Sequence, residues 1–154
     1  MALDDPRVDS FTEFASAAAP RLRHALTCVL GVEAGKDAAS EALAYGWENW
    51  DRVAAMENPV GYLYVVGRNH GTRVRKIRVL FPEPPTDRTP WVEPALPSSL
   101  QALPERQRQA VMLIHGYGWT QMEVAELLDI SKTTVQQHLE RGVATLRKSL
   151  GVNR

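Results

Sequence analysis

Residues 120–148 restrict the possible folds most strongly, because two amphipathic helical segments are separated there by only a short turn. Thr120 is suited to cap the first helix, and Glu123, three residues later, completes a capping box. The turn begins at Asp129, after which Ser131 can cap a second helix. Apolar residues then recur at helical spacing: Val135, Leu139, Val143, Leu146 and Leu150. The pattern predicts a helix-turn-helix.

The outward side chains of the second predicted helix favour a role in DNA binding. In a helix-turn-helix this helix can enter the major groove, where polar side chains contact base edges and phosphates. The outward residues near its start are Lys132, Thr133, Thr134, Gln136, Gln137 and His138. The alternative is a helical hairpin whose polar face is only solvated. We favour DNA binding because the capping box, the short turn, the small Ala125 and the amide-rich second helix occur together.

Composition limits the partners and the compartment of the chain. At 154 residues there is room for one domain or two small ones, and a hydrophobic content of 44% is ordinary for a folded protein. The formal net charge is zero, so DNA binding has to rest on local basic patches. The single cysteine, Cys28, lies in an apolar run, which predicts a buried thiol. With no membrane-spanning apolar run and no signal peptide, we expect a cytoplasmic protein.

The N-terminal part of the chain predicts two amphipathic helices. The first is expected to begin at Ser10, after a loose tail over residues 1–9, and to end at Gly31, with a kink or a break at Pro20. Its apolar face comprises Phe11, Phe14, Ala15, Ala18, Leu22, Ala25, Leu26 and Val29. The second is expected from about Lys36 to Val53. Its apolar stripe comprises Ala39, Ala42, Leu43, Gly46, Trp47, Trp50 and Val53.

Two features of this second helix have alternative interpretations. Trp47 and Trp50 could stack on bases, but their place on the apolar stripe favours a role in the core. The opposite face carries Asp37, Ser40, Glu41 and Glu48. That face is either a solvated acidic surface or a docking surface for a basic partner.

A third helix is expected to start at Pro59, since proline suits the first turn of a helix. Residues 68–78 contain five Lys and Arg side chains and no acidic one, which is a notable concentration on a neutral chain. A basic helix face attracts phosphates, and an asparagine can contact a base. The candidates for nucleic-acid contact are Arg68, Asn69, Arg73, Arg75, Lys76 and Arg78. The alternative is an ordinary cationic face.

Residues 79–97 hold six of the ten prolines and predict an extended linker. Trp91 within it is expected to pack on a neighbouring surface. The chain therefore predicts an all-α protein with two small helical domains, residues 8–78 and 98–151. The second domain opens with a helix that Pro104 starts or interrupts, and residues 115–119 form the turn into the helix-turn-helix.

These segments resemble a known family. LPERQRQAVML, GYGWTQMEVAELLDIS and TTVQQHLERGVATLRKSL, within residues 100–150, resemble region four of a bacterial sigma factor. The first domain resembles region two more weakly, over residues 11–31, residues 37–50 and the segment NPVGYLYVVGRN. Two such domains joined by a linker are the layout of the extracytoplasmic-function type of sigma factor, within the sigma-70 family.

The resemblance implies specific partners. Region two docks on the β′ clamp helices of core RNA polymerase and helps to open the minus-ten promoter element, while region four binds the β flap and recognises the minus-thirty-five element. It places Asp37, Ser40 and Glu41 on the clamp-facing helix, and residues 52–58 with the basic residues 68–78 on the minus-ten side. It places residues 131–141 on the minus-thirty-five side, which adds Ser131 and Arg141 to the candidates. The sequence leaves open whether an anti-sigma protein is a further partner.

The chain departs from the family pattern at several of these positions. Ser40 stands where the family commonly has Gln, and Asp129 replaces the usual glycine of the turn. Gln136, Gln137 and His138 stand where Lys or Arg is usual. The last three departures predict weaker phosphate anchoring by the recognition helix and a different promoter preference.

The leading hypothesis is a sigma factor without catalysis, cofactor or metal of its own. One alternative is a sigma-like DNA-binding regulator that does not initiate transcription, and docking to core polymerase separates the two. The other is a decoy for an anti-sigma partner, against which promoter binding would count. An enzyme is disfavoured because the four histidines have no metal-ligand spacing and no nucleophile motif is present.

Overall fold

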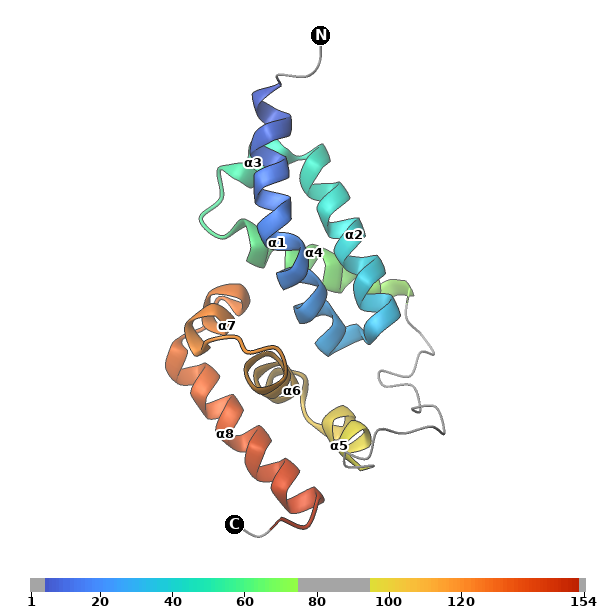
Figure 1. Cartoon of the computed structure of the whole chain (residues 1–154), viewed down its shortest axis with the longest axis vertical. Coiled ribbons are helices and arrows are strands. Elements are labelled where there is room, and N and C mark those ends of the chain that lie inside the picture. The colour runs from blue at the N-terminus through green and yellow to red at the C-terminus, as the bar shows by residue number, and fades with distance from the viewer. Residues whose placement is uncertain (1–4, 75–94, 153–154) are drawn as a thin grey trace. The chain divides into compact units, whose positions relative to one another are not determined.

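The computed structural model describes residues 5–74 and 95–152, except for the side chains of Arg73 and Val74. All elements of the described residues are helices (Figure 1), which confirms the predicted all-α class. The chain divides into two compact units, Met1–Lys76 and Ile77–Arg154. Most of the predicted linker, including Trp91, lies outside the described residues, as do Arg75, Lys76 and Arg78. In the described part of the chain, no helix is both long enough and apolar enough to cross a membrane.

The N-terminal unit is a small bundle in which α1, α2 and α4 pack on one another. Its elements are α1 (Pro6–Leu30), α2 (Val32–Glu48), α3 (Trp50–Ala54) and α4 (Pro59–Val74). The largest fully buried side chains of its core are Leu22, Leu26, Leu30, Val53 and Leu63. Cys28 is buried among them, as the sequence predicted.

Helix α1 differs from the prediction at its start and at Pro20. The helix begins at Pro6, because the Asp5 carboxylate accepts a hydrogen bond from the backbone N–H of Arg7 (2.9 Å) and proline suits the first turn. The expected loose tail is therefore wrong for residues 6–9. The helix also continues through Pro20 without a break and ends at Gly31, as predicted. A proline costs a helix interior about 3 kcal/mol, and burial of Ala18 and Leu22 on either side offsets that cost.

Helix α2 presents small residues where its neighbours approach. Its buried residues are Gly35, Ala38, Ala39, Ala42 and Gly46. A Cβ added at Gly67 on α4 would lie 2.8 Å from Leu26 Cδ1 and 3.0 Å from the carbonyl oxygen of Ala38. A side chain at Gly67 would therefore force the helices apart.

The helix predicted to end at Val53 is split into α2 and α3 at Asn49. Asn49 leaves the helical conformation (φ −116°, ψ 25°), and its Nδ2 donates to the carbonyl oxygen of Tyr45 (2.9 Å). The Tyr45 carbonyl oxygen also accepts from the Asn49 backbone N–H (3.0 Å), so the side-chain amide adds a second donor at the end of α2. The split changes the direction of the chain just before Arg52.

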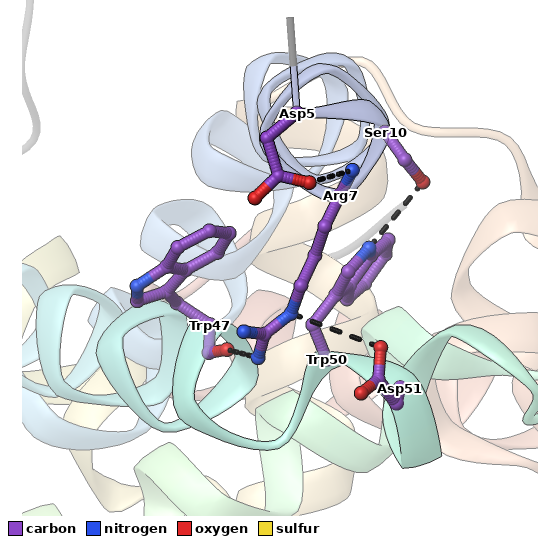
Figure 2. Close-up of polar contacts among 6 residues, drawn as sticks. All are labelled: Asp5, Arg7, Ser10, Trp47, Trp50 and Asp51. Carbon is purple, nitrogen blue, oxygen red and sulfur yellow. Dashed lines mark hydrogen bonds and ion pairs between the residues drawn. The ribbon is translucent and has the colours of Figure 1, made fainter. Parts of the chain in front are cut away.

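An aromatic and polar seam fastens the start of α1 to this corner (Figure 2). The centroid of the Phe11 ring lies 5.3 Å from those of both Trp47 and Trp50. Trp50 is buried, which confirms its predicted core role, whereas Trp47 is half-buried. The Arg7 guanidinium lies 4.6 Å from the Trp47 ring, donates to the Trp47 carbonyl oxygen (2.8 Å), and reaches Asp51 at 3.7 Å. Arg7 therefore caps the end of α2 and holds α3 beside it.

The C-terminal unit consists of short helices that pack along one long helix. They are α5 (Leu96–Ala102), α6 (Glu105–Val111), the π-helical segment η2 (Met112–Gly116), α7 (Gln121–Leu128) and α8 (Lys132–Ser149). Helix α5 begins inside the range expected as linker, and Leu103 and Pro104 break the chain between α5 and α6, as the proline predicted. A cluster of Leu103, Val111 and Leu146 is covered by Leu96, Leu100, Leu139 and Val143.

Arg108 stabilises the corner between α5 and α6. The side chain is buried at 7% exposure, and its Nη1 donates to the carbonyl oxygens of Gln101 (3.2 Å) and Leu103 (3.1 Å). Both carbonyls lie at the end of α5, where helical partners are missing. The buried guanidinium of Arg108 thus supplies hydrogen-bond donors to the carbonyl oxygens at the end of α5.

We predict that Arg108→Met lowers the free energy of unfolding by about 1–3 kcal/mol, because the stem packing remains while two buried carbonyls lose a charged donor. Urea unfolding of the full chain measures this change. The matched control is Arg106→Met, an exposed position on the same helix, for which we expect a change within about 0.5 kcal/mol. Equal effects of the two substitutions would show that Arg108 does not hold the corner.

Candidate nucleic-acid interface

The first helix of the helix-turn-helix is fixed by the predicted capping box. Thr120 Oγ1 accepts a hydrogen bond from the Glu123 backbone N–H (3.1 Å), and Glu123 Oε1 accepts one from the Thr120 N–H (3.2 Å). Val124, Ala125, Leu127 and Leu128 are buried beneath this helix. Both hydrogen bonds of the predicted capping box are therefore present.

The turn and the second cap also follow the sequence. Asp129 adopts the left-handed conformation (φ 53°, ψ 49°), and the backbone N–H of Ile130 donates to the Ala125 carbonyl oxygen (3.0 Å). Ser131 Oγ then accepts from the Thr134 N–H (3.1 Å) and starts α8. The predicted helix-turn-helix is therefore present as α7, the turn and α8 (Figure 1).

The start of α8 separates an apolar from a polar face. Val135 is 1% exposed and anchors the helix, while Thr134 and His138 are half-buried. The exposed candidates are Ser131, Lys132, Thr133, Gln136, Gln137 and Arg141. Gln136 Nε2 donates to Glu140 Oε1 (3.1 Å), whereas the structure gives the amide of Gln137 no such intrahelical bond. The amide of Gln137 is therefore exposed without an intrahelical bond.

His138 differs electrostatically from its polar neighbours. Partial burial, and then the positive charges of Arg106 and Arg141, hold the pKa of His138 below its ordinary value of about 6.5. His138 is therefore neutral at pH 7. Arg106 lies on α6 and was not among the residues selected from the sequence.

The acidic candidates of the N-terminal unit share one exposed face of α2. Asp37, Ser40 and Glu41 are spaced by three and four residues, and all three are exposed. Ala38, Ala39 and Ala42 are buried on the opposite face. The arrangement leaves the three polar side chains accessible to a partner.

The basic candidates of α4 are described only in part. Asn69 is exposed and Arg68 is half-buried. Arg73 belongs to α4, but its side chain lies outside the described residues, together with Arg75, Lys76 and Arg78. Their expected role in nucleic-acid contact stays a prediction.

Tyr45, Arg52 and Tyr62 form a further cationic and aromatic cluster. Arg52 lies in the range 52–58 that the resemblance placed on the minus-ten side, whereas neither tyrosine was a candidate. Arg52 Nη2 donates to the hydroxyl of Tyr45, whose oxygen lies 3.1 Å from that of Tyr62. The Arg52 guanidinium lies 6.0 Å and 5.8 Å from the two tyrosine rings. The hydrogen bonds of Tyr45 with Tyr62 and Arg52 lower the pKa of the Tyr45 phenol. No sequence motif joins these residues. They come together because the turn at Asn49 places α3 beside the end of α2 and the start of α4.

Comparison with known proteins identifies the family of the C-terminal unit. Residues 95–146 match the family model described as sigma-70, region 4. The C-terminal unit therefore contains a sigma-70 region 4 domain. The match extends from α5 into α8 and includes α7, the turn and α8 as far as Leu146.

A solved structure has a fold similar to that of this chain. The sigma factor RpoE, crystallised with the anti-sigma factor NepR from Bartonella quintana, is similar with a TM-score of 0.63 at 20% sequence identity. The similarity covers 94% of this chain and 99% of the other. Among curated proteins, no sequence matches. The region 4 resemblance seen in the sequence is thereby confirmed, and the fold over 94% of this chain is similar to that of a sigma factor.

We predict that Asp129→Gly raises the free energy of unfolding by up to about 1 kcal/mol, because glycine adopts the left-handed conformation without a Cβ penalty. Asp129→Val should lower it by about 1–2 kcal/mol. Thermal unfolding of the two variants beside the wild type measures both signs. Destabilisation by glycine would mean that the Asp129 side chain contributes more to the turn than its backbone strain costs.

Proposed function

We propose that this protein binds core RNA polymerase and directs promoter-specific initiation of transcription. In this proposal the N-terminal unit helps to open the minus-ten element, and the C-terminal unit recognises the minus-thirty-five element. The observation that carries the proposal is the capped helix-turn-helix within the matched region, whose second helix exposes a polar face at its N-terminal end.

The polar face of α8 suits a duplex in two ways. Exposed amide side chains such as Gln137 can form paired hydrogen bonds with a base edge in the major groove. Lys132 and Arg141 supply charge for phosphates, and Ser131, Thr133 and Thr134 add hydroxyls that can bind phosphate oxygens. This division of contacts supports sequence recognition with modest electrostatic anchoring.

The Tyr45–Arg52–Tyr62 cluster supports the role of the N-terminal unit. Unpaired bases stack on aromatic rings, and each stacked base contributes about 1–3 kcal/mol to binding. The Arg52 side chain is exposed, so its remaining N–H groups can reach a phosphate. The cluster thus offers ring faces and a cation to a single strand.

For polymerase docking we propose the exposed face of Asp37, Ser40 and Glu41, through complementary charge on the β′ clamp helices. The C-terminal unit would bind the β flap, as the family resemblance implies. RpoE was solved with an anti-sigma factor, so a protein that competes for the same faces is a further candidate partner.

A second candidate function is a DNA-binding regulator that does not initiate transcription. The observation in its favour is Ser40, which stands on the docking face where the family commonly has Gln. A decoy for an anti-sigma partner would keep the same faces without needing to bind DNA.

The test combines purified bacterial core RNA polymerase, the full chain and run-off transcription on a pool of promoters. Retention of polymerase together with new transcripts supports a sigma factor. DNA binding without polymerase binding supports the regulator, and binding of neither supports the decoy. If polymerase binding is weak, Ser40→Gln is the first substitution to introduce.

For the docking face, we predict that Asp37→Lys weakens binding to core polymerase about tenfold or more, because an attraction becomes a repulsion. Fluorescence anisotropy with labelled protein measures the affinity. Glu13→Lys, an exposed substitution of the same charge change on α1, is the matched control and should bind like the wild type. Equal loss in both variants would indicate a general charge effect rather than a docking face.

For the aromatic cluster, we predict that Arg52→Gln lowers the affinity for single-stranded DNA about fivefold and reduces the salt slope by about 0.7, the value of one lost phosphate contact. Duplex binding by the C-terminal unit should be unchanged. Arg23→Gln, exposed on α1, is the control for net charge. An unchanged single-strand affinity in Arg52→Gln would exclude the cluster from this contact.

A further inference from the structure

Helices α6 and α8 approach closely at Gly142. A Cβ added there would lie 2.8 Å from Val111 Cγ2 and 3.3 Å from the carbonyl oxygen of Gln107. His138 lies one turn before Gly142 on α8 and therefore faces the same side of that helix. Its partial burial agrees with this position beside α6.

Two arginines flank this histidine. Arg106 precedes Gln107 on α6, and Arg141 follows His138 by three residues on α8. Both arginines are exposed, and in the described part of the chain neither forms an ion pair with a carboxylate. Three basic side chains from two helices thus meet at the flank of the recognition helix, where two of them lack a compensating charge.

We propose that Arg106, His138 and Arg141 form a binding site for one phosphate of the DNA backbone, and that the site takes up a proton when it binds. The proposal rests on the proposed function, since the phosphate belongs to duplex DNA on α8. Arginine guanidinium groups suit phosphate oxygens geometrically, and a protonated imidazole adds a third charged donor.

The proton uptake follows from the charges around His138. In the free protein, burial and the two arginines hold the pKa of His138 below its ordinary value. A phosphate between the arginines offsets their repulsion and favours the imidazolium, so the pKa of His138 is higher in the complex. Binding therefore strengthens as the pH falls through the range between the two pKa values, by tenfold for each unit that separates them.

No other charged group of the described residues changes the direction in which the pKa of His138 shifts on binding. Helix α5 (LPSSLQA) carries no charged residue, α6 carries Glu105 next to Arg106, and α7 carries Glu123, held in the capping box, and Glu126. None of these carboxylates is among the groups that shift the pKa of His138. On α8, Glu140 accepts the hydrogen bond from Gln136.

The experiment measures the affinity of the full chain for a short mixed-sequence DNA duplex at low salt, between about pH 8 and about pH 5.5, the range in which histidine titrates. We expect the wild type to bind about three- to tenfold more tightly at the acidic end. His138→Gln should lose most of this gain. His138→Arg, with a permanent charge, should bind more tightly at pH 8 and show little change with pH.

Arg106 is tested by a matched pair of variants. Arg106→Gln should weaken duplex binding about fivefold, lower the salt slope by about 0.9, and raise the pKa of His138 measured by NMR in the free protein. Arg147→Gln, exposed near the other end of α8, removes the same charge and should do none of these.

Two outcomes would overturn the site alone: a pH profile of His138→Gln identical to that of the wild type, or equal affinities of Arg106→Gln and Arg147→Gln. Absence of duplex binding at every pH would overturn both the site and the proposed function. The two failures are therefore distinguishable.

Discussion

Both units depend on helix backbones that approach closely at small residues. In the N-terminal unit a Cβ added at Gly35 would lie 2.7 Å from the backbone of Thr27, and Gly67 lies against Ala38 in the same way. In the C-terminal unit Gly142 brings α8 against α6. A unit of this size has a small core, so close backbone approach and dense packing contribute a large share of its stability.

Two arginines stabilise the corners at which one helix ends and the next begins. Arg7 caps the end of α2 and Arg108 caps the end of α5, each by donating to carbonyl oxygens that have no helical partner. Guanidinium is suited to this task because it presents several donors on a stem that packs against apolar side chains. The corner that Arg7 holds directs α3, and α3 carries Arg52.

A neutral chain can still bind DNA when its charges are separated in space. The N-terminal unit gathers carboxylates on the exposed face of α2 and a cation beside two tyrosine rings at Arg52. The C-terminal unit places Arg106 and Arg141 around His138 at the flank of the recognition helix. Each patch acts over roughly a Debye length, about 10 Å at moderate salt, so the local balance of charge determines the partner rather than the net value.

The sequence by itself determined the local features of the chain. These are the caps at Thr120 and Ser131, the start of α4 at Pro59, and the helix-turn-helix that carries the family resemblance. Such signals act within a few residues, so they can be recognised without knowing the fold. The tertiary structure decided where apolar burial carried α1 through Pro20 and where Asn49 split the second helix. It also decided the two clusters around Arg52 and His138. Their members lie on different helices, and only the packing of those helices, which no local pattern encodes, brings the side chains together.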